Sequence, residues 1–183
     1  MSRKKIITLN NLADTDTRYL DKLTTVFNKK FFDDKLKKAL NEEIAKSSPF
    51  AFLLIDIDDF ENFNELNGYE RGDQVLQQLG LLLNKNLRES DFCIRYEDDQ
   101  FLVVLIESDK DNAYRVGERI RRIIEEHVFP GEQLQPGGEV TVSIGLASYP
   151  VDGESIAFLI KRADTALYRA KEKMKNRVEV FHF

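Results

Sequence analysis

Two short apolar segments, Phe92–Tyr96 and Phe101–Ile106, are separated by only the four polar residues Glu97–Gln100. That spacing predicts a β-hairpin, whose two strands must be antiparallel neighbours in one sheet. The segments around the hairpin alternate between helical and strand patterns, so the other strands are joined through helices. A hairpin among such connections predicts a mixed sheet with helices on both faces, an α+β fold.

The remaining elements follow from hydrophobic periodicity and from the positions of Gly and Pro. Residues 29–46 and 72–88 place apolar side chains at helical spacing, and residues 50–57 form a continuous apolar run of strand length. After the hairpin, the chain predicts a helix, a loop rich in Gly and Pro, a strand, a helix and a final strand. These are residues 111–127, 130–138, 139–148, 154–174 and 177–183, and a short helix at 58–67 stops at Gly68.

Length and charge limit the classes of function that this chain can have. Its 183 residues suffice for one domain with a sizeable core. We expect residues 1–20 to be a linker or the end of an upstream helix, and residues 21–183 to form the domain. The net charge of −5 argues against a nucleic-acid-binding surface. No apolar run approaches the roughly 20 residues that span a bilayer, and the single cysteine, Cys93, excludes an internal disulfide. A cytoplasmic protein is therefore expected.

The apolar run at residues 50–57 ends among carboxylates, at Asp56, Asp58 and Asp59. Carboxylates at the end of a strand lie at the sheet edge, where open sheets commonly bind ligands. Their hard oxygens suit Mg²⁺ that holds a triphosphate. Asp58 or Asp59 could equally cap the following helix, and both interpretations stay open at this point.

The predicted hairpin tip carries a second concentration of charge, Glu97-Asp98-Asp99-Gln100. Three adjacent carboxylates repel one another unless a cation or solvent screens them. A solvated polar turn explains the same residues, and composition alone favours that explanation.

Segments spread over nearly the whole chain match, in order, the motifs of one known family. They are Asp21-Lys22-Leu23-Thr24 with Phe27-Asn28-Lys29-Lys30, Leu54–Phe60, Gly72-Asp73, Arg95–Phe101, Thr141–Gly145 and Arg162–Lys171. On these segments the chain resembles the GGDEF family of bacterial enzymes that make cyclic di-GMP, from about Leu20 to Val180. The fold implied is the nucleotide-cyclase palm, which agrees with the mixed sheet expected above.

The resemblance assigns roles to several residues. In the family, two domains each hold one GTP and join them into cyclic di-GMP. Asp56 and Asp99 would hold Mg²⁺ on the triphosphate, so the ion is expected only if nucleotide binds there. The other matched residues could also be solvated polar groups on helices, and descent from a GTP site is favoured. They are Asn64 and Asp73, which match the guanine-recognising pair, Lys171, which matches a phosphate-binding lysine, and Lys175, which stands where the family usually has arginine.

The signature loop departs from the family pattern. Glu97 and Asp98 replace two glycines, which would serve a positive φ in a tight hairpin and a close approach to nucleotide. Gln100 replaces a glutamate, Glu61 a phosphate-facing lysine, and Thr25 a glycine of the first motif. At about 8 Å and an effective dielectric constant of about 20, each charge–charge interaction is about 2 kcal/mol. The added negative charge therefore disfavours triphosphate binding and efficient cyclase activity.

The family's inhibitory site is an Arg-x-x-Asp string placed five residues before the signature, and Arg88–Asp91 stands in that register. Arg119 stands where a further arginine of this site is expected. An arginine can bind the O6/N7 edge of guanine in bidentate fashion, and an aspartate can accept from N1–H and N2–H₂. The same string occurs out of register at Arg18–Asp21 and Arg95–Asp98. A surface ion pair is the alternative to ligand binding.

We therefore predict a GGDEF domain with little or no cyclase activity that binds cyclic di-GMP through Arg88, Asp91 and Arg119 and signals to an unknown protein partner. The first alternative is a weak diguanylate cyclase that uses Asp56 and Asp99. The second is an interaction or dimerisation module that binds no nucleotide. Because cyclic di-GMP is two-fold symmetric and often stacks as a pair in this family, binding could also bridge two copies of the chain.

Overall fold

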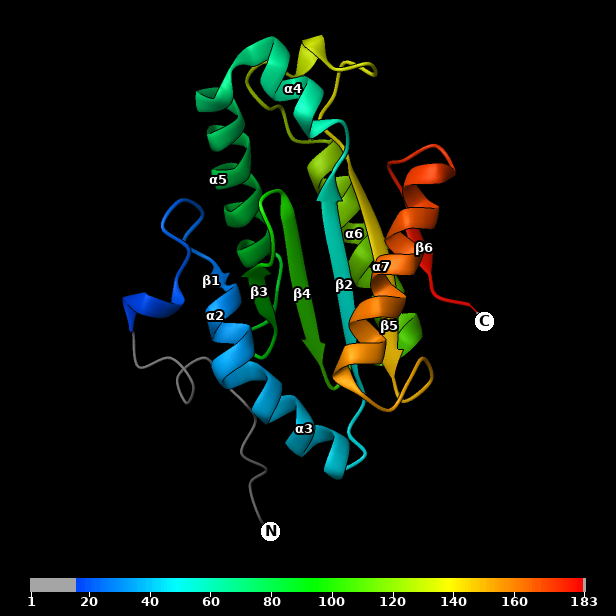
Figure 1. The fold of residues 1–183 in the computed structure, drawn as a ribbon. Coiled ribbons are helices and arrows are strands. Elements are labelled where there is room, and N and C mark those ends of the chain that lie inside the picture. The colour runs from blue at the N-terminus through cyan, green and yellow to red at the C-terminus, as the bar shows by residue number, and fades with distance from the viewer. Residues whose placement is uncertain (1–15, 183) are drawn as a thin grey trace.

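The computed structural model describes residues 16–182, and its sheet is built around the apolar run that forms β2 (Phe50–Ile57), all of whose residues are buried. β2 is antiparallel to β4 (Gln100–Ile106) on one side and to β5 (Val142–Tyr149) on the other. The predicted hairpin joins β4 to β3 (Phe92–Arg95). The six-stranded order is β1-β3-β4-β2-β5-β6, in which β1 is Phe27–Asn28 and β6 is Val178–Val180 (Figure 1).

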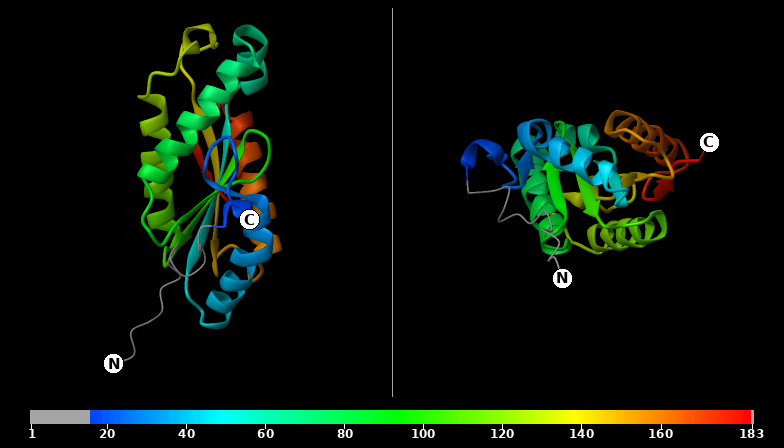
Figure 2. Two further views of the ribbon diagram at one scale, coloured as in Figure 1. Left: turned by 90° about the vertical axis from the view of Figure 1, so that its left-hand side faces the viewer. Right: turned by 90° about the horizontal axis from the view of Figure 1, so that it is seen from below.

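Alternate side chains of β2 enter two separate cores, because successive residues of a strand point to opposite faces of the sheet. Leu53 and Ile55 pack with apolar residues of the helices on one face, and Phe52 and Leu54 with those on the other. Figure 2 shows the sheet between these two helical layers, which confirms the predicted α+β class. One layer contains α5 (Tyr69–Lys85) and α6 (Lys110–Glu125); the other contains α2 (Lys29–Phe31), α3 (Lys37–Ala45) and α7 (Ile156–Glu172).

Most differences from the predicted elements lie at their ends. α5 begins at Tyr69 rather than at residue 72, so only Gly68, with φ 83°, separates it from α4 (Phe60–Asn67). β5 begins at Val142 rather than at residue 139, and the final strand is shorter than predicted. The predicted helix at residues 29–46 contains a π-helical turn at Phe32–Leu36.

The predicted N-terminal linker lies largely outside the described residues, as does residue 183 of the predicted last strand. Its described part contains a short 3₁₀ helix, Thr17–Tyr19, and Leu20 forms an isolated antiparallel bridge with Phe27. None of the helices within residues 16–182 is long and apolar enough to cross a membrane.

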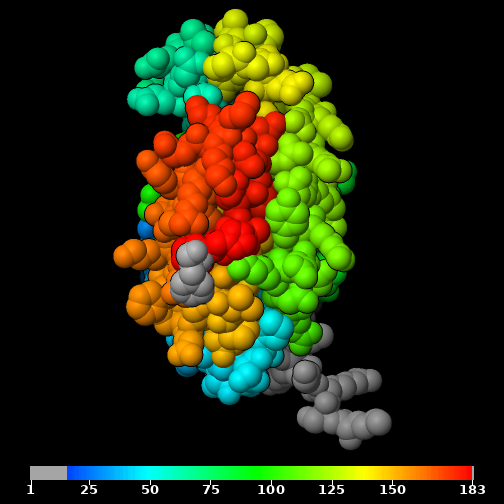
Figure 3. Space-filling view, turned by 90° about the vertical axis from the view of Figure 1, so that its right-hand side faces the viewer, coloured from blue at the N-terminus to red at the C-terminus, as the bar shows by residue number. Residues whose placement is uncertain are grey.

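Three chain segments meet at the upper end of the sheet in Figure 1. They are the C-terminal end of β2, the tip of the β3–β4 hairpin and the C-terminal end of α7. The C-terminal end of α7 lies at the molecular surface near α4 (Figure 3). This convergence brings together side chains that are far apart in the sequence.

Candidate functional site

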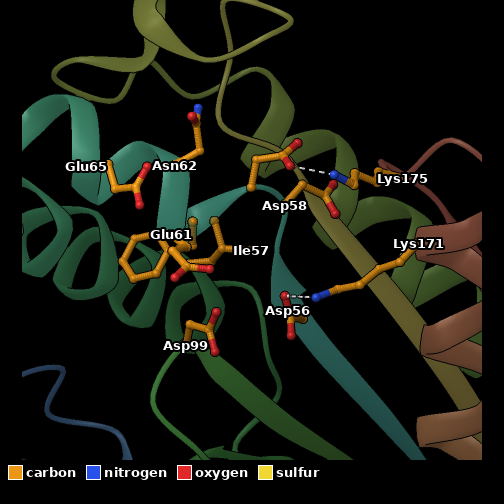
Figure 4. A pocket seen from close by; sticks show the side chains of 11 residues that line it. Asp56, Ile57, Asp58, Glu61, Asn62, Glu65, Asp99, Lys171 and Lys175 are labelled. Carbon is orange, nitrogen blue, oxygen red and sulfur yellow. Dashed lines mark hydrogen bonds and ion pairs between the residues drawn. The ribbon is translucent and has the colours of Figure 1, made fainter.

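A pocket of about 410 Å³ lies where β2 ends, between α4, the hairpin tip and the end of α7 (Figure 4). We call it the β2 pocket. Its lining contains six carboxylates and two lysines, so its net charge is negative. The charged lining residues are Asp56, Asp58, Asp59, Glu61, Glu65, Asp99, Lys171 and Lys175.

Asp56 is buried in this pocket, with 3% of its surface exposed, and both of its carboxylate oxygens are engaged. The ammonium group of Lys171, from the last turn of α7, lies 2.5 Å from Oδ1. The amide nitrogen of Gln100 donates a hydrogen bond of 2.8 Å to Oδ2. The register of the sheet explains the second contact, because Asp56 on β2 lies directly opposite Gln100 on β4.

Asp99 lies in the same pocket, as the resemblance implied, and points towards Asp56 (Figure 4). Burial raises the pKa of the Asp99 carboxyl above its ordinary value, and the nearby charge of Asp56 raises it further. No ion pair within residues 16–182 includes Asp99. The two residues predicted to hold Mg²⁺ thus line the same pocket. Asp56 has an ion pair with Lys171, whereas Asp99 has none with the described residues.

Asp58 and Asp59 have different surroundings, and neither side chain caps α4. Asp58 is buried and accepts hydrogen bonds from the hydroxyls of Ser143, at 2.7 Å, and Thr141, at 2.8 Å. It also accepts from the backbone N–H of Asn176 at 2.9 Å. Asp59 has a left-handed backbone, with φ 54°, and its carboxylate pairs with Lys175 at 2.5 Å. The capping interpretation is therefore wrong for both side chains.

The expectation that the hairpin tip needs glycine for a positive φ is wrong. Neither Glu97 nor Asp98 has a positive φ, so this turn places no steric demand for glycine at those positions. Instead, the Arg95 guanidinium donates to the carbonyl oxygen of Asp98, and Lys29 lies 3.5 Å from the Glu97 carboxylate. Charge and side-chain volume are what the two acids add to the tip.

The predicted guanine-recognising pair lies on adjacent helices, outside the lining of the β2 pocket. The side-chain oxygen of Asn64, on α4, lies against Gly72 on α5, where an added Cβ would come within 1.8 Å of it. That oxygen is buried and accepts no hydrogen bond within residues 16–182. Asp73 follows Gly72 in the helix and is exposed. A side chain at position 72 would therefore displace the Asn64 side chain from its present place.

The residues predicted to bind cyclic di-GMP gather near the start of β3 and on α6, and we call them the arginine site. Asp91 is 8% exposed, and its carboxylate accepts from the backbone N–H groups of Arg88, at 3.1 Å, and Ile106, at 3.3 Å. Burial raises the pKa of Asp91, while the charges of Arg88 and Arg119 act in the opposite direction. Both arginines are exposed, and Arg119 donates to the carbonyl oxygen of Asn86 at 2.8 Å.

The two out-of-register strings have local structural contacts. Arg18 pairs with Asp16 rather than with Asp21. Asp21 accepts from the backbone N–H and the hydroxyl of Thr24, and also from the guanidinium of Arg95 at 3.1 Å. These contacts fix the turn before β1 against the β3–β4 hairpin.

The backbone conformation of the loop after α7 was not predicted. Three consecutive residues there, Met174, Lys175 and Asn176, have positive φ values of 104°, 58° and 46°. The side chain of Asn176 donates to Glu125 on α6 at 2.6 Å and accepts from Arg121 at 2.8 Å. Asparagine is the one residue of the three that commonly adopts this backbone. Asn176 was therefore the only signal in the sequence for this backbone conformation.

Comparison with known proteins identifies the family. The sequence profile described as "Diguanylate cyclase, GGDEF domain" matches residues 18–177 of the chain. The chain belongs to the GGDEF family. The predicted resemblance is thereby confirmed.

Two curated relatives and a solved structure show how far the likeness extends. The chain is 38% identical to the uncharacterized protein YhcK of Bacillus subtilis over 165 residues, covering 87% of this chain and 45% of YhcK. It is 34% identical to diguanylate cyclase A of Treponema denticola over 177 residues, covering 94% of this chain and 47% of that enzyme. The chain thus spans about half the length of these curated relatives.

The crystal structure of the GGDEF domain of DgcB from Caulobacter crescentus, in complex with c-di-GMP, superposes with a TM-score of 0.80 at 27% identity. The match covers 91% of this chain and 94% of that domain. The mixed sheet and its helices are therefore the common GGDEF fold.

Proposed function

We propose that this GGDEF domain is a regulatory module that binds cyclic di-GMP at the arginine site, with little or no cyclase activity, and passes the bound state to a protein partner. The observation that carries the proposal is the state of Arg88 and Arg119. Both guanidinium groups are exposed, and neither forms an ion pair within residues 16–182. They are available to an anionic ligand that carries guanine bases.

The chemistry of the ligand suits such a pair. A guanidinium fork can donate two parallel hydrogen bonds to the O6/N7 edge of guanine, and it also attracts the phosphates. Asp91 supports the site mainly by holding the turn of residues 88–91, because each of its oxygens already accepts a backbone hydrogen bond. A guanine N–H group would use the remaining lone pairs of Asp91. In this proposal, Arg88 and Arg119 supply most of the affinity.

The β2 pocket supports the part of the proposal that concerns catalysis. Lys171 and Lys175, which would have to bind phosphates, are already paired with Asp56 and Asp59. A triphosphate would have to break these pairs and approach the carboxylates of Glu61 and Asp99, which form no ion pair with the described part of the chain. Both steps oppose binding of GTP. DgcB, whose GGDEF domain has this fold, was crystallised with c-di-GMP, which makes that ligand the reasonable one to test.

The test is calorimetry with cyclic di-GMP and, separately, with GTP. Wild-type protein should bind cyclic di-GMP, and Arg88→Ala should weaken binding at least about tenfold, because one charge-assisted contact contributes roughly 1.5–3 kcal/mol. Arg18→Ala is the matched control, since it removes an exposed arginine from an out-of-register string. If wild type and Arg88→Ala bind equally well, or if neither binds, the proposal fails. Light scattering on the same samples tests whether the ligand bridges two copies.

A weak diguanylate cyclase is the second candidate, because Asp56 and Asp99 do lie together in one pocket with Lys171 nearby. Incubation with GTP and Mg²⁺, followed by product detection, distinguishes the two functions. Robust formation of cyclic di-GMP, lost in Asp99→Ala, would favour the enzyme and overturn the regulatory module.

A further inference from the structure

We propose that the β2 pocket functions without a divalent metal ion, because Lys171 and Gln100 together hold the Asp56 carboxylate from both sides and exclude such an ion. Gln100 is thus a positioning residue whose contact with Asp56 determines whether the pocket binds a divalent metal ion. This inference concerns the β2 pocket alone. It stands or falls independently of cyclic di-GMP binding at the arginine site.

Both carboxylate oxygens of Asp56 already have a donor. A carboxylate that binds a metal must turn at least one oxygen towards the ion. Here Oδ1 faces the Lys171 ammonium group at 2.5 Å, and Oδ2 faces the Gln100 amide at 2.8 Å. Asp56 is 3% exposed, so it has little open surface at which an ion could be added. A metal ion could reach either oxygen only by displacing one of these two donors.

The other carboxylate oxygens near the end of β2 do not complete a metal site. Mg²⁺ requires near-octahedral oxygen coordination, and Mn²⁺ sites use similar ligands. Asp58 is committed to three donors, and Asp59 is paired with Lys175. Within residues 16–182, Asp99 and Glu61 also line the pocket without an ion pair, and Asp99 is the one that the resemblance assigns to the metal. In residues 16–182 there is no group of three or more His, Cys, Asp or Glu side chains placed to hold a metal ion. The donor set does not fit the Mg²⁺ that the family resemblance implied.

Gln100 blocks metal binding at Asp56 because it acts there as a hydrogen-bond donor. Asp56 can only accept hydrogen bonds while it is ionised, so the Gln100 nitrogen faces it rather than the amide oxygen. The sheet register places the two residues side by side, and this contact does not depend on a flexible loop. A glutamate at position 100 would replace a donor with an acceptor beside Asp56. It would also bring a third carboxylate next to Asp56 and Asp99, which is an arrangement that needs a cation.

The experiment measures binding of MnCl₂ by the loss of the free Mn²⁺ signal in electron paramagnetic resonance. Wild type should bind Mn²⁺ no more tightly than Asp56→Asn does. Gln100→Glu should bind it at least about tenfold more tightly than wild type, because affinity rises with the number of charged ligands. Gln77→Glu makes the same chemical change on an exposed face of α5 and should match wild type. Adding Asp56→Asn to Gln100→Glu should remove the gain.

A second variant keeps the proposal testable if Gln100→Glu fails to fold. Lys171→Met frees Oδ1 of Asp56 and should also increase Mn²⁺ affinity, with the increase again lost when Asp56→Asn is added. Wild-type binding that is as tight as that of these variants and depends on Asp56 would overturn the proposal. So would the absence of any gain in both variants. Cyclic di-GMP calorimetry on the same proteins should be unchanged, which separates this result from the test of the arginine site.

Discussion

The β2 pocket and the arginine site balance their charges in opposite ways. In the pocket, each lysine is paired with an aspartate of the same end of the sheet, Lys171 with Asp56 and Lys175 with Asp59. In the arginine site, the aspartate turns inward to two backbone N–H groups, and the guanidinium groups of Arg88 and Arg119 remain exposed. The two regions share one sheet and lie in one domain.

This difference shows that one domain can hold, in separate regions, cations with and without ion pairs to its described residues. A cation that is already paired gains little from a new anion, since the old pair must first be broken. An exposed guanidinium without an ion pair keeps its hydrogen-bond donors available. Within this domain, anion binding is therefore expected at the arginine site and disfavoured in the pocket.

The largest effect is expected for Asp58→Asn. Asp58 is buried and accepts three hydrogen bonds, so losing its charge and one acceptor should lower the free energy of unfolding by about 2–4 kcal/mol. Asp59→Asn makes the same change next to it, at a partly exposed ion pair, and should cost less than about 1 kcal/mol. Urea unfolding measures both. Equal costs for the two variants would show that the Asp58 network is not structural.

A smaller effect of opposite sign is expected for Met174→Gly in the loop after α7. Met174 has φ 104°, which is unfavourable for a side chain, and it is 91% exposed, so little packing is lost on substitution. The variant should be more stable by about 1 kcal/mol, a rise in Tm of about 2–4 °C for a domain of this size. Met174→Ala keeps the Cβ and should resemble wild type. A loss of stability in Met174→Gly would mean that the loop conformation is not strained.

Much of the fold could be predicted because it follows from local pattern. The apolar run of β2 and the two short strands around a polar turn required no knowledge of distant residues. The start of α5 was placed too late because Gly72 was treated as a helix boundary. In the structure that glycine lies inside the helix and allows Asn64 to approach closely. Local pattern cannot distinguish a glycine needed for packing from one needed to end a helix.

Several residues that line the β2 pocket could be predicted, but not their partners, and the predicted Asn64 and Asp73 lie outside that lining. The sequence places Asp56 at a strand end, and the resemblance adds Asp99 and Lys171. That Lys171 and Gln100 would both contact Asp56 depends on how β2, β4 and α7 are arranged in three dimensions. Likewise, the sequence does not show that the oxygens of Asp91 accept from the backbone of Arg88 and Ile106. Such choices between competing donors are decided by tertiary packing.

The smallest effect is expected for Asp99→Asn, and its pH dependence makes it specific. Burial and the neighbouring Asp56 raise the pKa of Asp99 above 3.8 in the folded protein. The folded state therefore binds a proton more readily than the unfolded state, and stability falls as the pH rises from 3.8 through the raised pKa. Above the raised pKa the charge of Asp99 is present and unfavourable, so removing it should stabilise the fold. Because the side chain is only half-buried, solvent screening should keep the gain below about 1 kcal/mol.

The measurement for Asp99→Asn is thermal unfolding of the variant and wild type between about pH 7 and about pH 4. The variant should have the higher Tm at neutral pH, and its advantage should shrink as wild-type Asp99 becomes protonated at low pH. Asp164→Asn, on an exposed position of α7, serves as the control and should show no such trend. If Asp99→Asn lowers the Tm at neutral pH, then attraction to Lys171 outweighs burial and the charge of Asp56, and this prediction is wrong.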